Sequence, residues 1–210
     1  MKAFLSLILF LSISFVGFAQ QDYSDSGFTN KAEAKNLMVK GKKEGKWVEY
    51  FEKYYQITKD TNAPFYRLTI YKSGKPYGMQ KMYFKSGKLA SEISYVNGKR
   101  NGVSREYYEN GKLKSVCAFS NDWINGNAIN YYENGNISNE DVFTNGVING
   151  IRKCYNEDGS MDFEVLYVNG EREGIQKGYY PDGKLRFLIT YKHGREKEEK
   201  NYDENGNVIK

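Results

Sequence analysis

The side chains that could perform acid–base or nucleophilic chemistry are few in this sequence. The single histidine, His193, cannot by itself form a His-based metal cluster or the base-and-orienter pair of nucleophilic catalysis. Carboxylates recur every 24 residues at Glu109, Glu133 and Glu157. A glycosidase pair needs two carboxylates in one cleft with different environments. If each repeat contributes two strands, these carboxylates instead line an exposed edge, about 10 Å apart.

Other catalytic motifs are missing from the sequence. There is no Gly-x-Ser-x-Gly nucleophile elbow and no phosphate loop with Gly-Lys-Ser. The Asp158-Gly159 and Asp182-Gly183 pairs lack the spaced acidic ligands of a calcium loop and fit turns better. A hydrolase is therefore the least favoured class. We expect a protein that is not an enzyme, with no catalytic residues, no cofactor and no metal.

The elements that position these side chains are set by a repeat of 24 residues. Each repeat contains an aromatic residue, a turn, a second glycine four residues later, a tyrosine and a further glycine. The aromatic residues are Tyr71, Tyr95, Phe119, Phe143, Tyr167 and Tyr191. A fixed period of this length is typical of architectures in which each unit packs on its neighbours.

Each repeat accommodates two strands. Val103 to Tyr108 and Leu185 to Tyr191 alternate apolar and polar side chains with the period of two that strands require. The connector Tyr108 to Lys112 contains an Asn-Gly pair, which is typical of tight hairpins. Frequent glycine disfavours helices beyond Gly41. The sequence predicts an all-β fold, an elongated antiparallel sheet of about seven stacked 24-residue β-hairpins.

Both ends of the array depart from the repeat. Near the N-terminus, a nine-residue insertion around Gln56 to Pro64 delays the return strand. In the last unit, Glu198 occupies the glycine position and one residue is missing before Tyr202. We expect both ends to be caps or decayed copies of the repeat. Residues 20–36 are polar and predict a loosely ordered lead-in, with a short helix at Lys31 to Asn36. The repeat domain then covers residues 37–210.

Residues 1–19 fit a secretory signal peptide. Lys2 supplies the positive start, Ala3 to Val16 carries no charge, and Gly17 to Ala19 offers small cleavage-site residues. An uncleaved membrane anchor is the alternative. We therefore expect an exported protein that is periplasmic, outer-membrane-associated or secreted.

The two cysteines, Cys117 and Cys154, would lie about 14 Å apart across three strand intervals. That separation exceeds the ~7 Å Cα limit of a disulfide, so we expect free thiols.

The hairpin units resemble a known repeat family. Asn97 to Gly102, followed by Tyr107 to Leu113, resembles the MORN repeat, and specifically the bacterial variant found in YwqK-type antitoxins. The resemblance covers about residues 37–210. It implies an elongated sheet of hairpins, a binding or scaffold role and no catalytic residues.

Two tyrosine rows follow from the strand alternation. The row Tyr83, Tyr107, Tyr131, Tyr155, Tyr179 and Tyr202 is interpreted mainly as core, with direct ligand contact as the alternative. The adjacent residues Phe84, Tyr108, Tyr132 and Tyr180 point to the other face and predict a half-exposed row. Exposed tyrosines favour binding of a protein, peptide or sugar.

Two loops carry apolar residues where the other units are polar. These are Trp123-Ile124 and Val147-Ile148, and Asp122 replaces a turn glycine beside them. The four residues either form an exposed contact site or fold back onto the sheet as core. We take Tyr108, Tyr132, Tyr180, Trp123, Ile124, Val147 and Ile148 as candidate partner-binding residues.

The composition narrows the class of partner. The chain has 210 residues and a net charge of +5, with 16% aromatic residues and interleaved charges. The lack of a basic run argues against nucleic acid. We therefore expect an exported scaffold that binds a protein or peptide. An envelope antitoxin or immunity protein, and a membrane- or cell-wall-associated structural protein, are the alternatives. The oligomeric state is left open.

Overall fold

One β-sheet dominates the computed structural model, which describes residues 28–52 and 56–209. In chain order its elements are the 3₁₀ helix η1 (Lys31–Glu33), then β1 (Leu37–Val39), β2 (Lys42–Phe51), β3 (Ile57–Thr58), β4 (Phe65–Lys72), β5 (Lys75–Phe84), β6 (Leu89–Val96), β7 (Lys99–Tyr107), β8 (Leu113–Ser120), β9 (Trp123–Tyr131), β10 (Ile137–Thr144), β11 (Val147–Ile148), β12 (Gly150–Tyr155), β13 (Met161–Val168), β14 (Glu171–Tyr179), β15 (Leu185–Lys192), β16 (Arg195–Tyr202) and β17 (Val208–Ile209).

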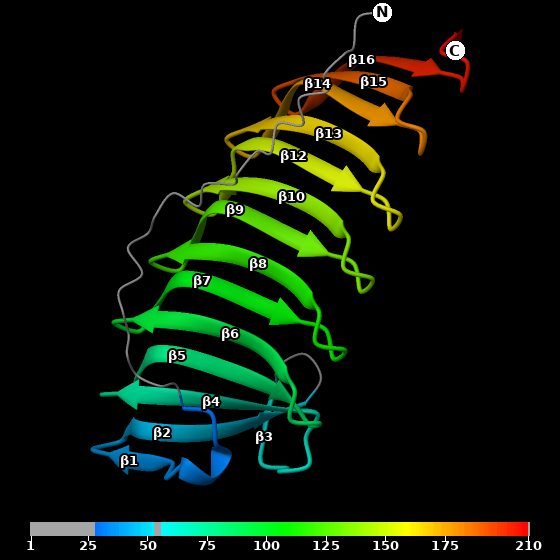
Figure 1. Ribbon diagram of the computed structural model, residues 1–210. Coiled ribbons are helices and arrows are strands. Elements are labelled where there is room, and N and C mark those ends of the chain that lie inside the picture. Colours follow the sequence, from blue (N-terminus) through cyan, green and yellow to red (C-terminus); the bar gives the residue numbers. More distant parts are fainter. Residues whose placement is uncertain (1–27, 53–55, 210) are drawn as a thin grey trace, which may run out of the picture.

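The strands pair in the order of the sequence. From β4 to β10, and again from β12 to β16, each strand is antiparallel to the one before it and the one after it. Strand β10 joins the two runs by pairing with both β11 and β12. Figure 1 shows the result, a long twisted ladder of hairpins. The predicted elongated antiparallel sheet is confirmed.

The turns between repeats are tight two-residue turns. In the turn between β6 and β7, Asn97 and Gly98 have φ angles of 52° and 81°, and Val96 pairs with Lys99. Positive φ at both central residues defines the type I′ turn, whose twist matches that of the strands it joins. Asn121 and Asp122 adopt the same conformation, with φ angles of 50° and 75°, although neither is glycine.

The Asn110-Gly111 pair forms a different loop from the tight hairpin predicted there. Gly111 has a φ of 90° and donates its N–H to the carbonyl of Tyr108, whose own N–H donates to the carbonyl of Lys112, both at 2.9 Å. This is a three-residue loop with a left-handed glycine at its end. The two loop types alternate, so one long side of the sheet carries the two-residue turns and the other carries the three-residue loops.

The second glycine of each repeat marks a β-bulge. Gly102 has a φ of 104°, and the register between β6 and β7 shifts between Ile93 and Tyr95. A left-handed glycine inside a strand is a usual place for such a bulge. In the last unit Glu198 replaces this glycine, and the register shift between Thr190 and Tyr191 is correspondingly smaller.

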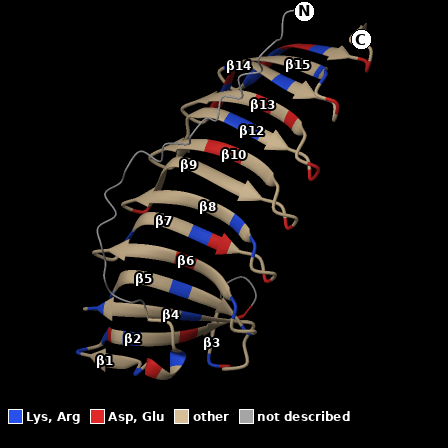
Figure 2. Cartoon of the chain, viewed as in Figure 1, with Lys and Arg blue, Asp and Glu red and all other residues tan. Residues whose placement is uncertain are grey.

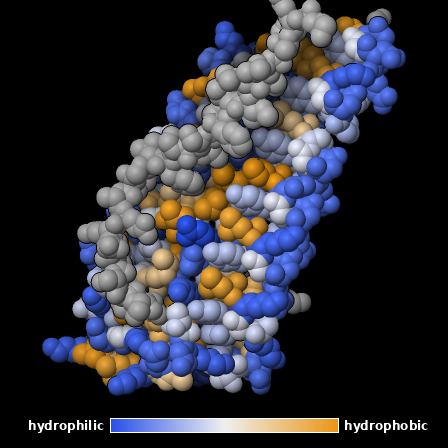
Figure 3. All heavy atoms as spheres, in the orientation of Figure 1, coloured by the Kyte–Doolittle hydropathy of each residue, from blue (hydrophilic) through white to orange (hydrophobic). Residues whose placement is uncertain are grey.

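Cross-strand pairing defines two faces, because residues that pair share a side of the sheet. The groove face contains the aromatic residue of each repeat and residues at the centres of both strands, such as Ser104 on β7 opposite Cys117 on β8. The tyrosine face contains Tyr83, Tyr107, Tyr131, Tyr155 and Tyr179. In Figure 3, apolar side chains form separate clusters on the face turned to the viewer, and the edge on the right is hydrophilic.

The tyrosine row is half-buried, which differs from its interpretation mainly as core. The hydroxyls of Tyr107, Tyr155 and Tyr179 donate to Glu92, Glu140 and Glu164 at 3.1–3.2 Å. Burial, followed by the charge of Glu140, raises the pKa of Tyr155 to about 12. A single sheet has no second layer to cover a face, so these rings keep a polar partner and part of their exposure.

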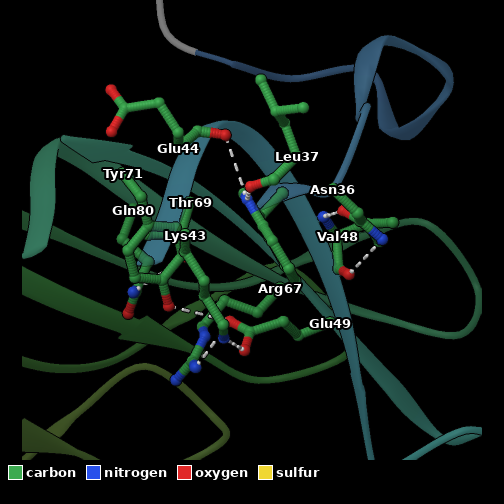
Figure 4. A network of polar contacts seen from close by, with 11 residues as sticks. Asn36, Leu37, Lys43, Glu44, Val48, Glu49, Arg67, Thr69, Tyr71 and Gln80 are labelled. Atoms are coloured by element: carbon green, nitrogen blue, oxygen red, sulfur yellow. Dashed lines mark hydrogen bonds and ion pairs between the residues drawn. The ribbon is translucent and has the colours of Figure 1, made fainter. Parts of the chain in front are cut away.

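The N-terminal end is closed by side chains and short segments. Phe28 is only 2% exposed. The Asn36 side chain accepts from the N–H of Val48 at 2.8 Å and donates to its carbonyl at 3.4 Å, as Figure 4 shows. Strand β3, which lies in the predicted insertion, pairs with the end of β2. These contacts satisfy an edge that would otherwise offer backbone groups to another strand.

The lead-in and the C-terminal edge complete the array. The predicted helix at Lys31 to Asn36 is shorter than expected and is the 3₁₀ helix η1. Residues 1–27, which include the predicted signal peptide and half of the lead-in, lie outside the described residues. The last long strand, β16, exposes a run of charged side chains, which is a common protection for a sheet edge. Strand β17 pairs with its final residues.

Candidate binding surface

The groove face contains an open groove of about 600 Å³ that extends from β4 to β10. Its floor is made of small side chains, Ser91, Ser104, Ser115 and Ala128, on neighbouring strands. Tyr95, Phe119 and Phe143 line it on the side of the two-residue turns. Small residues on the floor beside large aromatic ones make a trough in a sheet that is otherwise continuous. Such a trough fits an extended chain better than an enclosed small molecule.

The N-terminal end of the groove contains a buried carboxylate, shown in Figure 4. Glu49 is 7% exposed and contacts Lys43, the Arg67 guanidinium at 2.9 Å and the Tyr71 hydroxyl at 3.1 Å. Burial raises the pKa of Glu49, but the hydrogen bonds from Lys43 and Arg67 outweigh it, and the net pKa lies below its ordinary value. Arg67 also lines the groove, and its Nε is buried without a hydrogen-bond partner.

A second buried ion pair lies at the other end. Asp141 is 5% exposed and accepts hydrogen bonds from the Arg152 guanidinium, at 2.5 and 3.1 Å, and from the Asn139 amide. Asp141 raises the pKa of Arg152 through these hydrogen bonds. This pair was not predicted from the sequence. The signal was present, because Asp141 occupies a repeat position held elsewhere by Thr69, Ile93, Cys117, Val165 and Ile189.

Between these ends the groove carries accessible charge of both signs. The Arg100 side chain is 41% exposed and lies over the Phe119 ring, 4.3 Å from its centroid. The Glu106 side chain is 45% exposed and approaches Lys114 at 4.0 Å. In Figure 2, basic and acidic residues are scattered over different strands, and acidic residues recur in the loops on the right. The groove therefore offers aromatic, cationic and anionic contacts within one surface.

The tyrosines expected to contact a partner are engaged within the protein. The hydroxyls of Tyr108, Tyr132 and Tyr180 donate to the carbonyls of Tyr131, Tyr155 and Tyr202 at 2.7 Å. Each bond joins one hairpin to the next along the side of the three-residue loops. The rings are half-buried, so a partner would meet their faces rather than their hydroxyls. Asn156 stands at the equivalent position of the fourth repeat and does not extend the series.

The four apolar loop residues divide between the two faces. Ile124 pairs with Phe119 and lines the groove, and Ile148 pairs with Phe143 on the same face. Trp123 and Val147 lie on the tyrosine face and are 61% and 45% exposed. The Trp123 ring packs against Gly146, where an added Cβ would lie 2.5 Å from the indole Cε3. The quartet therefore does not form one patch.

The remaining reactive side chains occupy ordinary structural positions. Cys117 and Cys154 are free thiols, as predicted, and burial raises the pKa of both. His193 lies in a two-residue turn with a φ of 51°, and its side chain is 77% exposed. Within residues 28–52 and 56–209, no group of three or more His, Cys, Asp or Glu side chains is arranged to hold a metal ion. The same residues contain no helix long and apolar enough to cross a bilayer.

Stacked hairpins that share one open sheet, with a groove on one face, define a repeat scaffold. The model of the MORN repeat variant family matches residues 76–97, 100–121, 124–145, 148–169 and 172–193, each of which contains one hairpin. The matched segments cover more than half of the chain, so the chain belongs to this family. No curated protein matches the sequence.

Proposed function

We propose that this protein is an exported, non-enzymatic scaffold that binds an extended segment of a protein or peptide along its groove face. The observation that carries the proposal is the groove, whose floor of small residues lies beside Tyr95, Phe119 and Phe143. Aromatic residues and arginine are enriched at binding interfaces, and here both lie along one trough. Membership of a MORN repeat family is consistent with a scaffold role.

The loop side contributes a second set of contacts in this proposal. Tyr108, Tyr132 and Tyr180 present their ring faces along the side of the three-residue loops, while Ile124 lines the groove and Ile148 lies on the same face. Trp123 and Val147 lie on the other face and would contact a partner that wraps around the turns. The exposure of both side chains supports this contact.

Filling the groove tests the proposal. Ser104→Phe places a ring on the floor, and Phe is well tolerated in strands. The mature chain from Gln20 onward serves as bait in extracts of the native organism. We expect Ser104→Phe to reduce capture of the principal partner at least tenfold. Ser120→Phe, a half-buried serine on the tyrosine face, is the matched control and should leave capture within twofold. Equal capture by both variants and the native chain would overturn the groove as the binding surface.

A narrower role at the cell envelope follows from the likeness of the hairpin units to YwqK-type antitoxins. In that role the bound partner is a toxin, and the residues of the predicted signal peptide carry the protein out of the cytoplasm. Co-expression with the product of a neighbouring gene tests this role. Rescue of growth that is lost in Ser104→Phe would support it, and the absence of a toxic neighbour would exclude it.

A membrane-associated structural role is the alternative partner class. It predicts that the mature chain floats with liposomes at physiological salt. If the Ser104→Phe variant still floats with liposomes, the partner would be a lipid surface rather than a protein. Failure to float would leave the protein partner as the proposal.

A further inference from the structure

Further along the same face, a cluster of hydrogen-bond donors surrounds Arg172. Its Nε donates to the hydroxyl oxygen of Tyr167 at 3.2 Å, and its Nη1 donates to that of Tyr191 at 2.9 Å. The guanidinium also lies over the Tyr191 ring, 5.1 Å from the centroid. Because both hydroxyl oxygens accept from Arg172, their own protons point elsewhere. Neither hydroxyl donates a hydrogen bond to another residue within the described part of the chain.

Arg100 occupies the repeat position equivalent to Arg172, and it shows that an arginine at this position can bind a carboxylate. Arg100 lies over Phe119 as Arg172 lies over Tyr191, and its Nε donates to the Asp122 carboxylate at 3.3 Å. The Asp122 carboxylate also accepts from the backbone N–H of Arg100 at 2.9 Å. Three repeats later, the residue at the position of Asp122 is Gly194. The repeat therefore provides a carboxylate for Arg100 and none for Arg172.

Two other arginines on the groove face are also paired with carboxylates. Arg67 pairs with Glu49, whose carboxylate also accepts from the Tyr71 hydroxyl, and Arg152 pairs with Asp141. A tyrosine hydroxyl and an arginine converging on a carboxylate is thus an arrangement that this chain already uses. At Arg172 the donors are present, and among the described residues no carboxylate pairs with them.

The surroundings of Arg172 favour an anion. Arg152, whose charge is paired with Asp141, lies over the Tyr167 ring, 5.4 Å from its centroid, which leaves Arg172 as the unpaired guanidinium of the cluster. The hydrogen bond to Tyr167 is the largest contribution that raises the pKa of Arg172. Glu196 is the carboxylate on the next strand, opposite Tyr191, and its exposed side chain forms no ion pair with Arg172.

We propose that Arg172, Tyr167 and Tyr191 form a binding site for a carboxylate that a peptide partner supplies from an Asp or Glu side chain. The site lies three strand intervals beyond the end of the groove, about 14 Å away. The proposal rests on the peptide-binding function above and specifies the partner, an extended segment that lies in the groove and places an acidic residue at Arg172. Arginine and hydroxyl donors bind carboxylates strongly because the acceptor is charged.

The site can be tested by a substitution that introduces the missing carboxylate into the chain itself. Gly194 has a φ of 72°, close to the 75° that Asp122 adopts, and a Cβ added at Gly194 makes only ordinary contacts with Glu171. Gly194→Asp therefore places a carboxylate at the position of Asp122 relative to Arg172. Gly194→Asn is the neutral control of the same shape.

The probe is a fluorescent hexaglutamate peptide, titrated against the mature chain from Gln20 onward. We expect Gly194→Asp and Arg172→Gln each to weaken binding tenfold or more, as loss of a charged hydrogen bond predicts. Tyr167→Phe with Tyr191→Phe should weaken it by a smaller factor, since the rings still pack. Gly194→Asn should stay within twofold of the native chain. Arg195→Gln removes the same charge from an exposed position and should also stay within twofold.

Several outcomes would overturn the proposal. Equal weakening by Arg195→Gln would show that only net charge matters. Failure of hexaglutamate to bind the native chain, with or without binding to phosphatidylglycerol vesicles, would exclude a peptide carboxylate. The melting temperature of each variant shows whether a loss comes from unfolding. If hexaglutamate does not bind but Ser104→Phe still abolishes partner capture, only the carboxylate site fails. If Ser104→Phe has no effect while Gly194→Asp does, only the groove fails.

Discussion

The Phe187 ring lies directly over Gly178 on the neighbouring strand, and it occupies the space that a Cβ on Gly178 would need. At the other repeats this position carries Met82, Glu106, Asn130 and Cys154. The residue opposite each of the first two is a serine, which leaves room for a side chain. Position 178 therefore requires glycine because the Phe187 ring occupies the space of a side chain, and not because the backbone turns there.

This relationship predicts that Gly178→Ala destabilises the protein. In an ordinary strand the same change is expected to stabilise, because glycine loses more conformational freedom on folding. Here the Phe187 ring must move, which costs about 1–3 kcal/mol. Urea denaturation measures the difference. The double variant with Phe187→Leu should recover part of the loss, and a full loss in the double variant would show that the ring is not the cause.

The Glu49 cluster predicts a loss of stability in acid. The pKa of Glu49 is lower in the folded protein than its ordinary value of 4.5. Its contribution is therefore complete above pH 4.5 and is lost as the pH falls through the lower folded pKa. We expect Glu49→Gln to remove this part of the acid dependence, while Glu133→Gln, at an exposed loop, retains it. Identical acid profiles for Glu49→Gln and the native chain would contradict the assignment.

At the alkaline end, Tyr155 makes the opposite contribution. Its pKa is raised to about 12 from an ordinary value of 10.0, so the folded protein holds the proton more tightly. The contribution is complete below pH 10 and is lost as the pH rises toward 12. Denaturation at several alkaline pH values should show a shallower decline in Tyr155→Phe. Tyr155→Phe should also reduce the part of the tyrosinate absorbance that appears as the pH approaches 12.

Trp123→Ala separates a contact role from a packing role. The side chain is 61% exposed, so the melting temperature should change by no more than a few degrees. Partner capture should weaken if the partner wraps around the turns as proposed. Thermal denaturation of the mature chain, with Val165→Ala as a buried control, gives the comparison. A drop in melting temperature as large as that of Val165→Ala would show that Trp123 supports the fold.

The repeat made the fold predictable because its signals are local and occur many times. Hydrophobic alternation, paired turn residues and recurrent glycines all favour hairpins, and the aromatic positions identify the shared face. The loop types were harder to assign, because Asn97-Gly98 and Asn110-Gly111 have the same residues and form different turns. Their difference depends on the bulge and register of the flanking strands.

The site was less predictable, because it depends on where repeats differ. Asp141 interrupts a row that is otherwise apolar or small, and its pairing with Arg152 depends on the register between β10 and β12. Tyr108 and Tyr132 were expected to face a partner, yet their hydroxyls meet carbonyls one hairpin away. Those contacts depend on the twist between hairpins, which a single repeat does not specify.

Consecutive repeats pair edge to edge, so that one long open face is available to a partner. Small-angle X-ray scattering of the mature chain from Gln20 onward measures this directly. At about 4.8 Å per strand, the stacked strands from β2 to β16 extend about 60 Å. We therefore expect a maximum dimension of about 60 Å or more. A value near 40 Å, which corresponds to the ~16 Å radius of gyration of a compact chain of this length, would contradict the account.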